Sequence, residues 1–262
     1  MMKPMMKRCY KKNNKHKKKR KKIMKCKNVS IILLIFILTI VFCISCYILL
    51  KDLKEYKESD KSTEKLIEES IEIKEETQKR SIDWEYLKSI NKDIIAWIEI
   101  ENTKIDYPIL KDKDVYYLKH TFDKKYNSNG SIFTTNSYPF EDKETIVYGH
   151  NMKNGSMFSD LGKYLNKDFL NSHFNFKIYT PTCNYEARIF SVYSIGVETE
   201  SNNIKSLNFE DRIEYYKKAS EYNIETDSNI KKIVKLSTCS YLNATTIPTD
   251  QRYYIVANLI QL

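Results

Sequence analysis

The sequence has 262 residues, of which 30% are charged, and a formal net charge of +10. The charge is unevenly spread: residues 1–28 hold fourteen of the 44 Lys and Arg residues and no acid. The other 30 basic side chains face 34 acidic ones, so residues 29–262 carry close to −4. This distribution excludes a basic nucleic-acid-binding domain, and we expect no nucleic-acid partner.

An uncharged apolar stretch, residues 29–50, directly follows the basic tail. A helix of these 22 residues spans roughly 33 Å, enough to cross the hydrocarbon core of a bilayer. Lysines on its N-terminal side predict a cytoplasmic N-terminus, and no small-residue cleavage site of a signal peptide follows it. We therefore expect a cytoplasmic tail over residues 1–28, a retained single-pass signal-anchor over 29–50 in the cell membrane, and an extracellular remainder.

Residues 51–81 are rich in Glu, Lys and Ser and contain no Pro or Gly. Oppositely charged side chains recur at helical spacing, while Leu and Ile are sparse. This composition predicts a charged extracellular stalk, helical or disordered, with no function of its own.

Residues 82–262 are long enough for one domain with one core, which we expect to be mostly β. Asp83 is placed to cap a short amphipathic helix. Eight apolar or alternating segments with turn residues between them then predict a closed or nearly closed β-barrel. They cover residues 94–100, 105–110, 130–134, 145–150, 175–180, 185–194, 233–238 and 253–259. Two helical segments interrupt them, at about 157–172 and 208–222.

Cys239 ends the seventh of these segments, next to the polar side chains of Ser237, Thr238 and Ser240. An isolated cysteine is more often a buried small hydrophobe than a nucleophile. The polar surroundings and the end of a strand instead favour the partial exposure that thiolate chemistry needs. A disulfide between Cys183 and Cys239, the two cysteines expected outside the membrane, is the alternative that would block such chemistry.

His150 is the candidate acid or base among the three histidines of the expected domain. It ends an apolar segment and follows Gly149, a residue that lets the backbone turn sharply. His120 falls in an expected turn and His173 at the end of a helical segment, both on the surface. A histidine satisfied by local hydrogen bonds at a strand end is the alternative for His150.

Arg252 is the candidate for stabilising an oxyanion, because its guanidinium donates hydrogen bonds without losing its charge. It opens the last strand, thirteen residues after Cys239, so a hairpin-like return would bring it toward the thiol. Its competitors are Arg80 in the stalk, Arg188 within a strand and Arg212 on the solvated side of a helix.

Metal and nucleotide chemistry have little support in the sequence. No pair of His, Cys, Asp or Glu has the spacing typical of zinc ligands, and five glycines form no phosphate-binding loop. We expect no metal site and no cofactor.

These residues resemble the signature of the sortases, the cysteine transpeptidases that attach proteins to the cell wall of Gram-positive bacteria. Residues 236–239 (Leu-Ser-Thr-Cys) match the nucleophile motif, residues 148–151 (Tyr-Gly-His-Asn) the histidine motif, and Arg252 the arginine position. The helix before the first strand and the helical insertion before the cysteine strand are similar to class B. Two features depart from that pattern: Lys235 stands where many members carry Thr, and the loop from Cys239 to Arg252 is long.

The resemblance implies a closed eight-stranded sortase barrel over residues 82–262, with Cys239, His150 and Arg252 as catalytic residues. The implied reaction cleaves a C-terminal sorting signal of the Asn-Pro-x-Thr type in secreted proteins. The Thr carbonyl is then joined to an amine of a peptidoglycan precursor through a thioacyl-enzyme. The implied substrate contacts are Ser237, Thr238, Tyr148 and Asn151.

Two other classes of function remain open from the sequence. An extracellular Cys/His peptidase or amidase would hydrolyse its substrate even when a good amine acceptor is present. A non-enzymatic membrane-anchored binding module would keep its function after a Cys239→Ala substitution.

Overall fold

The computed structural model of this protein describes residues 3–74, 79–242 and 249–262. The chain divides into two compact units, Met1–Lys54 and Glu55–Leu262. Helix α1 (Lys3–Ser70) forms the described part of the first unit and continues into the second. Its portion from Ile31 onward contains a stretch long and apolar enough to cross a membrane, as expected for residues 29–50.

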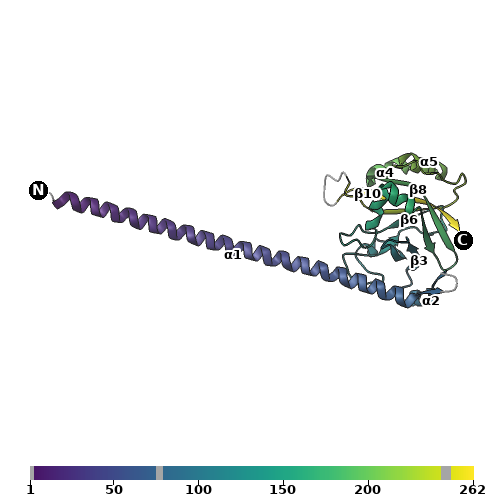
Figure 1. Cartoon of the computed structure of the whole chain (residues 1–262), viewed down its shortest axis with the longest axis horizontal. Coiled ribbons are helices and arrows are strands. Elements are labelled where there is room, and N and C mark those ends of the chain that lie inside the picture. The colour runs from purple at the N-terminus through teal and green to yellow at the C-terminus, as the bar shows by residue number, and fades with distance from the viewer. Residues whose placement is uncertain (1–2, 75–78, 243–248) are drawn as a thin grey trace. The chain divides into compact units, whose positions relative to one another are not determined.

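The second unit is built around a closed eight-stranded barrel, which confirms the expected fold (Figure 1). Around the barrel the strands follow the order β10, β8, β7, β3, β4, β5, β6, β9. Their bounds are β3 (Ile94–Glu99), β4 (Asp106–Lys111), β5 (Ile132–Thr134), β6 (Glu144–Tyr148), β7 (Asn175–Tyr179), β8 (Asn184–Gly196), β9 (Ile233–Cys239) and β10 (Gln251–Gln261). Two neighbouring pairs, β4 with β5 and β6 with β9, are parallel.

Alternation along the strands separates an inner from an outer face of the barrel. In β6, Thr145 and Val147 are buried between partly exposed neighbours. Val147 packs with Leu236 of β9 and Ile255 of β10 in the apolar cluster that fills the barrel. The residues that alternate with these positions therefore lie on the outer face.

Short helices precede the first barrel strand or lie in the connections between strands. Helix α2 (Trp84–Ile90) begins at the expected cap, where the Asp83 carboxylate accepts a hydrogen bond from the Tyr86 backbone N–H. The segment expected to be helical over 157–172 contains a 3-10 helix, η2 (Ser159–Leu165), followed by α3 (Lys167–Ser172). A further 3-10 turn, η1 (Tyr116–Leu118), lies between β4 and β5.

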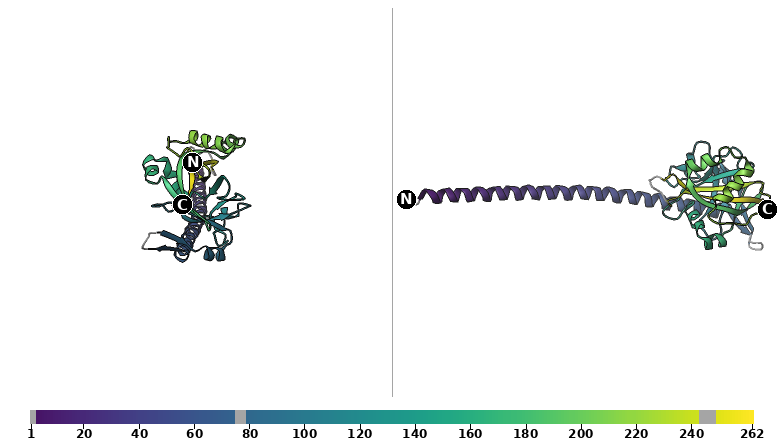
Figure 2. Two further views of the ribbon diagram at one scale, coloured as in Figure 1. Left: turned by 90° about the vertical axis from the view of Figure 1, so that its right-hand side faces the viewer. Right: turned by 90° about the horizontal axis from the view of Figure 1, so that it is seen from above.

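The insertion between β8 and β9 holds two helices, α4 (Val197–Ile204) and α5 (Phe209–Ala219), of which only the second was expected. Both lie on the same side of the barrel near β8 and β10, as Figures 1 and 2 show for α5. Ile213 and Tyr216 of α5 are buried against Tyr193 of β8 and Tyr254 of β10. The insertion therefore covers part of the outer face, which explains why β9 is buried on both faces.

Lys235 lies under this insertion, with only 1% of its side chain exposed. Its ammonium group forms an ion pair with Glu200 of α4 and lies over the rings of Tyr216 and Tyr254, at 4.7 and 4.3 Å from their centroids. Burial lowers the pKa of Lys235, while the Glu200 carboxylate opposes this shift. Lys235 therefore lies on the outer face of β9, but the outer face at this position is covered by protein.

The segment expected as a solvated stalk, residues 51–81, is in large part packed against the barrel. The compact unit begins at Glu55 rather than near residue 82. Leu66 of α1 is 2% exposed and belongs to an apolar cluster with Trp97, Leu110 and Tyr117. After α1, strands β1 (Ile71–Lys74) and β2 (Lys79–Ile82) form a small antiparallel sheet. The composition of the segment did not predict this packing, because serines make up much of the buried face of α1.

The buried ion pair predicts a large stability effect. Lys235→Met should lower the free energy of unfolding by about 3–5 kcal/mol, because it leaves the buried carboxylate of Glu200 without its cation. The double substitution Lys235→Met/Glu200→Gln should recover more than half of that loss. Chemical denaturation of the full chain in detergent measures both, and a loss below about 1 kcal/mol in the single variant would contradict the prediction.

Candidate active site

The hydrogen-bond register of three strands brings the expected site residues side by side. Strand β9 pairs with β10 so that Cys239 lies opposite Arg252. On its other edge β9 runs parallel to β6, with Ser237 opposite Tyr148. Strand β6 ends at Tyr148, and the same register continued two residues beyond that end would set His150 beside Cys239. Neighbouring strands lie roughly 4.8 Å apart, so the three backbones are adjacent.

Two hydrogen bonds hold His150 in this register beyond the end of β6. The Gly149 N–H donates to the Ser237 carbonyl at 3.2 Å, which continues the ladder with β9. The Asn151 side-chain amide donates to the Cys239 carbonyl at 2.8 Å. Asn151, expected as a substrate contact, therefore ties the histidine loop to the cysteine strand.

The His150 ring is oriented by a backbone carbonyl. Nε2 of His150 lies 2.8 Å from the Leu118 carbonyl oxygen. Because a carbonyl only accepts, Nε2 carries the proton of this bond. The His150 carbonyl in turn accepts from the Phe158 N–H at 2.9 Å. The bond satisfies one ring nitrogen of this strand-end histidine through a partner 32 residues away.

Cys239 is partly exposed and carries a free thiol. Cys183 is also free, so the two form no disulfide. Cys183 lies just before β8, whereas Arg252, which faces Cys239, pairs with Ile195 near the far end of that strand. The two thiols therefore belong to opposite ends of the barrel.

Arg252 keeps its guanidinium at the start of β10. Its Nη1 donates to the Thr249 and Gln251 carbonyls, each at 2.9 Å. The competing arginines pair with carboxylates elsewhere. Arg80 binds Asp106 and Glu99, Arg188 binds Glu186, and Arg212 binds Glu144. Arg80 is thus buried against the barrel, contrary to the expected stalk, and only Arg252 lies opposite Cys239.

A second row of outer-face residues lies two positions from the first, formed by Tyr148, Ser237 and Tyr254. Burial raises the pKa of Tyr148 and of Tyr254, so both are neutral phenols at ordinary pH. Ser237 is only 4% exposed in this row. Thr238 alternates to the inner face and is 2% exposed, which leaves it no surface for a substrate beside Cys239.

Sequence reasoning missed Leu118, because its contribution to the site is a backbone oxygen that any residue type would supply. Within residues 3–74, 79–242 and 249–262, no three His, Cys, Asp or Glu side chains lie close enough together to hold a metal ion. The side chains of the row are a thiol, an imidazole and a guanidinium.

The family model of the sortase domain matches residues 98–260 of this chain. The chain belongs to the sortase family, whose members are cysteine transpeptidases. Sortase B of Listeria monocytogenes is 44% identical over 164 residues, which cover 58% of this chain and 65% of the relative. Sortase B of Staphylococcus aureus is 31% identical over 189 residues, covering 68% of this chain and 75% of that protein. The match thus spans about two thirds of the length of the Listeria protein.

Solved structures of sortase B agree with the barrel. The Clostridium perfringens enzyme matches with a TM-score of 0.61 and 30% identity, covering 67% of this chain and 98% of that one. A Staphylococcus aureus sortase B–substrate complex matches with a TM-score of 0.65 and 26% identity, covering 80% and 99%. A structure of sortase B complexed with triglycine matches with a TM-score of 0.61 and 30% identity, covering 69% and 86%. The resemblance to class B is therefore confirmed.

The close packing around Gly149, next to His150, predicts a stability effect. A Cβ at this position would lie 2.4 Å from Ile132 Cδ1 and 2.7 Å from Phe158 Cδ2, so Gly149→Ala forces a shift next to His150. We expect a loss of about 1–3 kcal/mol in the free energy of unfolding, measured by chemical denaturation. In the control Gly162→Ala, the nearest atom is a Tyr253 ring carbon at 3.3 Å, and the loss should be smaller. Equal losses in the two variants would contradict the prediction.

Proposed function

We propose that this protein is a membrane-anchored class B sortase with Cys239 as nucleophile, His150 as acid and base, and Arg252 as oxyanion stabiliser. Its substrates are secreted proteins with a C-terminal sorting signal of the Asn-Pro-x-Thr type. The observation that carries the proposal is the single row in which the register sets His150, Cys239 and Arg252 on adjacent strands.

In the proposed reaction the Cys239 thiolate attacks the carbonyl carbon of the signal's Thr residue, and a tetrahedral oxyanion forms. Collapse of this intermediate breaks the peptide bond, leaves a thioester on Cys239 and releases the C-terminal fragment as an amine. An amine of a peptidoglycan precursor then attacks the thioester. A new amide bond forms and the thiolate returns to Cys239.

His150 first takes the thiol proton of Cys239, then gives this proton to the departing amine, and later removes one from the attacking amine. Because Nε2 is engaged by the Leu118 carbonyl, Nδ1 is the ring nitrogen available for this transfer. Arg252 lies opposite the nucleophile, where a fixed cation stabilises the oxyanion without gaining or losing a proton.

Apolar side chains near the row suit an extended peptide. Leu118, whose carbonyl holds His150, is partly exposed, as are Tyr241 and Leu242 just beyond Cys239. Val197 at the start of α4 is exposed and bonded through its N–H to the Asp250 carbonyl, two residues before Arg252. We propose Tyr148 and Ser237 as the residues behind this binding surface. The substrate complex and the triglycine complex of related sortases B support a peptide and an amine as the two reactants.

The membrane helix gives this chemistry its location. With residues 1–28 in the cytoplasm and the barrel outside, the enzyme meets secreted proteins and lipid-linked acceptor at the same membrane surface. Tethering raises the effective concentration of these partners and so favours transfer over hydrolysis.

A Cys239→Ala substitution tests the nucleophile. The full chain in detergent micelles is incubated with a fluorescence-quenched Asn-Pro-x-Thr peptide, with and without triglycine. The wild type should cleave the peptide and, with triglycine, form mainly the transfer product. Cys239→Ala should lose both activities, because no other group can form the thioester.

Cys183→Ala is the matched control and should retain full activity, because this free thiol lies at the other end of the barrel. Cleavage by Cys239→Ala at the wild-type rate would contradict the proposal. Hydrolysis without any transfer in the presence of triglycine would identify a peptidase or amidase instead.

Arg252→Lys tests the oxyanion role separately from charge. Lysine keeps the positive charge but loses the planar fork of donors, so kcat should fall about 100- to 1,000-fold with little change in thermal stability. Arg188→Lys, which changes an exposed arginine paired with Glu186, should behave as wild type. If kcat of Arg252→Lys stays within about threefold of wild type, the role of Arg252 is contradicted, and other hydrogen-bond donors stabilise the oxyanion.

A further inference from the structure

The orientation of His150 depends on a segment with little regular structure. Leu118, whose carbonyl accepts from His150 Nε2, ends η1 within the long connection between β4 and β5. Backbone in such a connection holds its position only through what packs against it. Three sets of contacts from α1, all within the second compact unit, pack against this connection.

The first set lies at the start of this unit. The Ser128 hydroxyl donates to the Glu55 carboxylate at 2.6 Å, and the Asn127 amide donates to the Glu55 carbonyl at 3.3 Å. Asn127 in turn bonds through its N–H to the Lys119 carbonyl at 3.0 Å, one residue after Leu118. The helix is thus linked by hydrogen bonds to the connection that orients His150.

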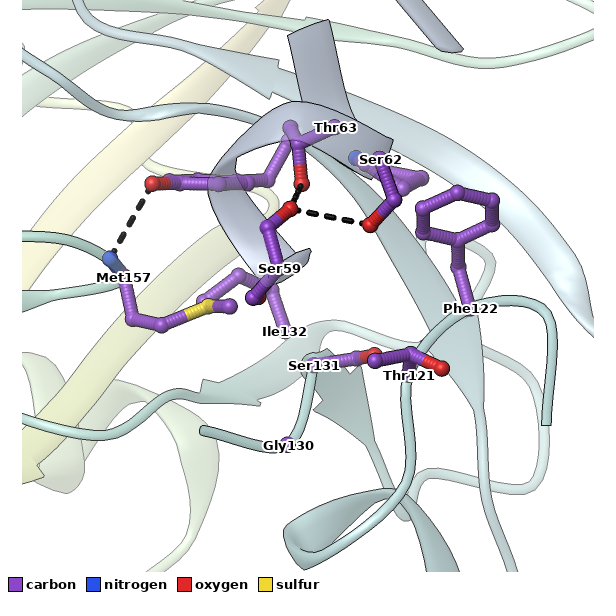
Figure 3. Close-up of a pocket in the computed structure, with 11 residues that line it drawn as sticks. Ser59, Ser62, Thr63, Thr121, Phe122, Gly130, Ser131, Ile132 and Met157 are labelled. Atoms are coloured by element: carbon purple, nitrogen blue, oxygen red, sulfur yellow. Dashed lines mark hydrogen bonds between the residues drawn. The ribbon is translucent and has the colours of Figure 1, made fainter. Parts of the chain in front are cut away.

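The second set is a close approach of small side chains, drawn in Figure 3. Ser59, Ser62 and Thr63 of α1 line a small pocket together with residues of the connection and with Met157. The hydroxyls of Ser62 and Thr63 donate to the Ser59 carbonyl of their own helix, so this face is buried at little polar cost. On the opposite wall lie Thr121, Phe122, Gly130, Ser131 and Ile132.

Gly130, on the pocket wall, is in direct contact with the backbone of Leu118. A Cβ at Gly130 would lie 2.5 Å from the Leu118 carbonyl oxygen, so the two backbones touch. The Ser131 N–H donates to the Tyr117 carbonyl at 2.9 Å and fixes the same pair of segments. Gly130 and Ser131, which line the pocket next to α1, therefore also support the Leu118 carbonyl, the acceptor for His150.

The third set is apolar. Leu66 of α1 is buried in one cluster with Tyr117 and Phe122, which flank Leu118 in the sequence. Met157, on the pocket wall, forms a bridge with Asn151 and precedes Phe158, whose N–H binds the His150 carbonyl. Asn151 and the His150 carbonyl are thus linked to the segment that begins at the pocket wall.

We propose that residues 55–70 of α1, the continuation of the anchor helix, are a positioning element of the active site that holds His150 in its working orientation. This inference rests on the proposed acid and base role of His150. The helix contributes no reacting group; it fixes the Leu118 carbonyl and thereby the imidazole. Loosening it should lower kcat more than it weakens peptide binding, because none of the surface side chains proposed to bind the peptide comes from this helix.

Leu66→Ala in the full chain in detergent micelles tests the proposal. Displacing an acid or base by about 1 Å costs up to 100-fold, so kcat for peptide transfer should fall about ten- to 100-fold. KM should stay within about twofold of wild type. The imidazole signal of His150 in a chain with 13C-labelled histidine should shift, identified among four histidines with a His150→Gln variant. Leu66→Met, which refills the space, should restore kcat and the signal.

Leu170→Ala is the matched control, because Leu170 of α3 is as deeply buried but is not part of the cluster that joins Leu66 to Tyr117 and Phe122. It should lose comparable thermal stability without the fall in kcat or the shift of the His150 signal. Equal kinetic losses in the two leucine variants would overturn the proposal, because they would assign the effect to stability alone.

Ser128→Ala provides a test that does not depend on core packing. It removes the hydroxyl bonded to Glu55, and kcat should fall about two- to tenfold with unchanged KM. Ser172→Ala, which removes an exposed hydroxyl bonded within α3, should leave kcat unchanged. Wild-type kinetics in Ser128→Ala and in Leu66→Ala would overturn the positioning role alone, whereas an inactive wild type would overturn the proposed function.

Discussion

The site depends on the hydrogen bonding of β9 along both of its edges. Its parallel pairing with β6 and antiparallel pairing with β10 set His150, Cys239 and Arg252 in one row. A slip of one residue in either pairing would move a whole strand's side chains to the other face. The inner face of β9 prevents such a slip, because Val234 and Leu236 are packed in the barrel cluster. Packing inside the barrel thus fixes a site that lies on its outside.

One part of the barrel's outer face is covered by helices, and another part, at the end of β9, is accessible. Helices α4 and α5 cover the outer face of β9 before Cys239 and of β10 after Arg252, including the ion pair of Lys235 with Glu200. This leaves only the end of β9 accessible, where Cys239 is partly exposed. A thiol at a strand end can meet an extended peptide, whereas one under the helices could not. The insertion therefore limits which part of β9 has accessible side chains on the outer face.

Helix α1 differs in character along its length. Its apolar part is suited to the membrane, and its continuation from Glu55 onward is packed against the barrel. Class B sortases of known structure share the barrel, and the contacts of residues 55–70 extend this chain's domain beyond its strands. Composition did not reveal this packing, because a face of serines whose hydroxyls bind their own helix carries almost no hydrophobic periodicity.

The sequence by itself determined the eight strands, the cap at Asp83, the apolar face of the helix around Ile213 and Tyr216, and the family, because these follow from local periodicity and from short motifs. It named His150, Cys239 and Arg252 as the candidate catalytic residues but could not show that they are adjacent. Only the tertiary structure decided that Lys235 is buried, that Thr238 faces inward, and that the Leu118 carbonyl holds His150. Each of these depends on contacts between residues far apart in the chain, and such contacts leave no local pattern in the sequence.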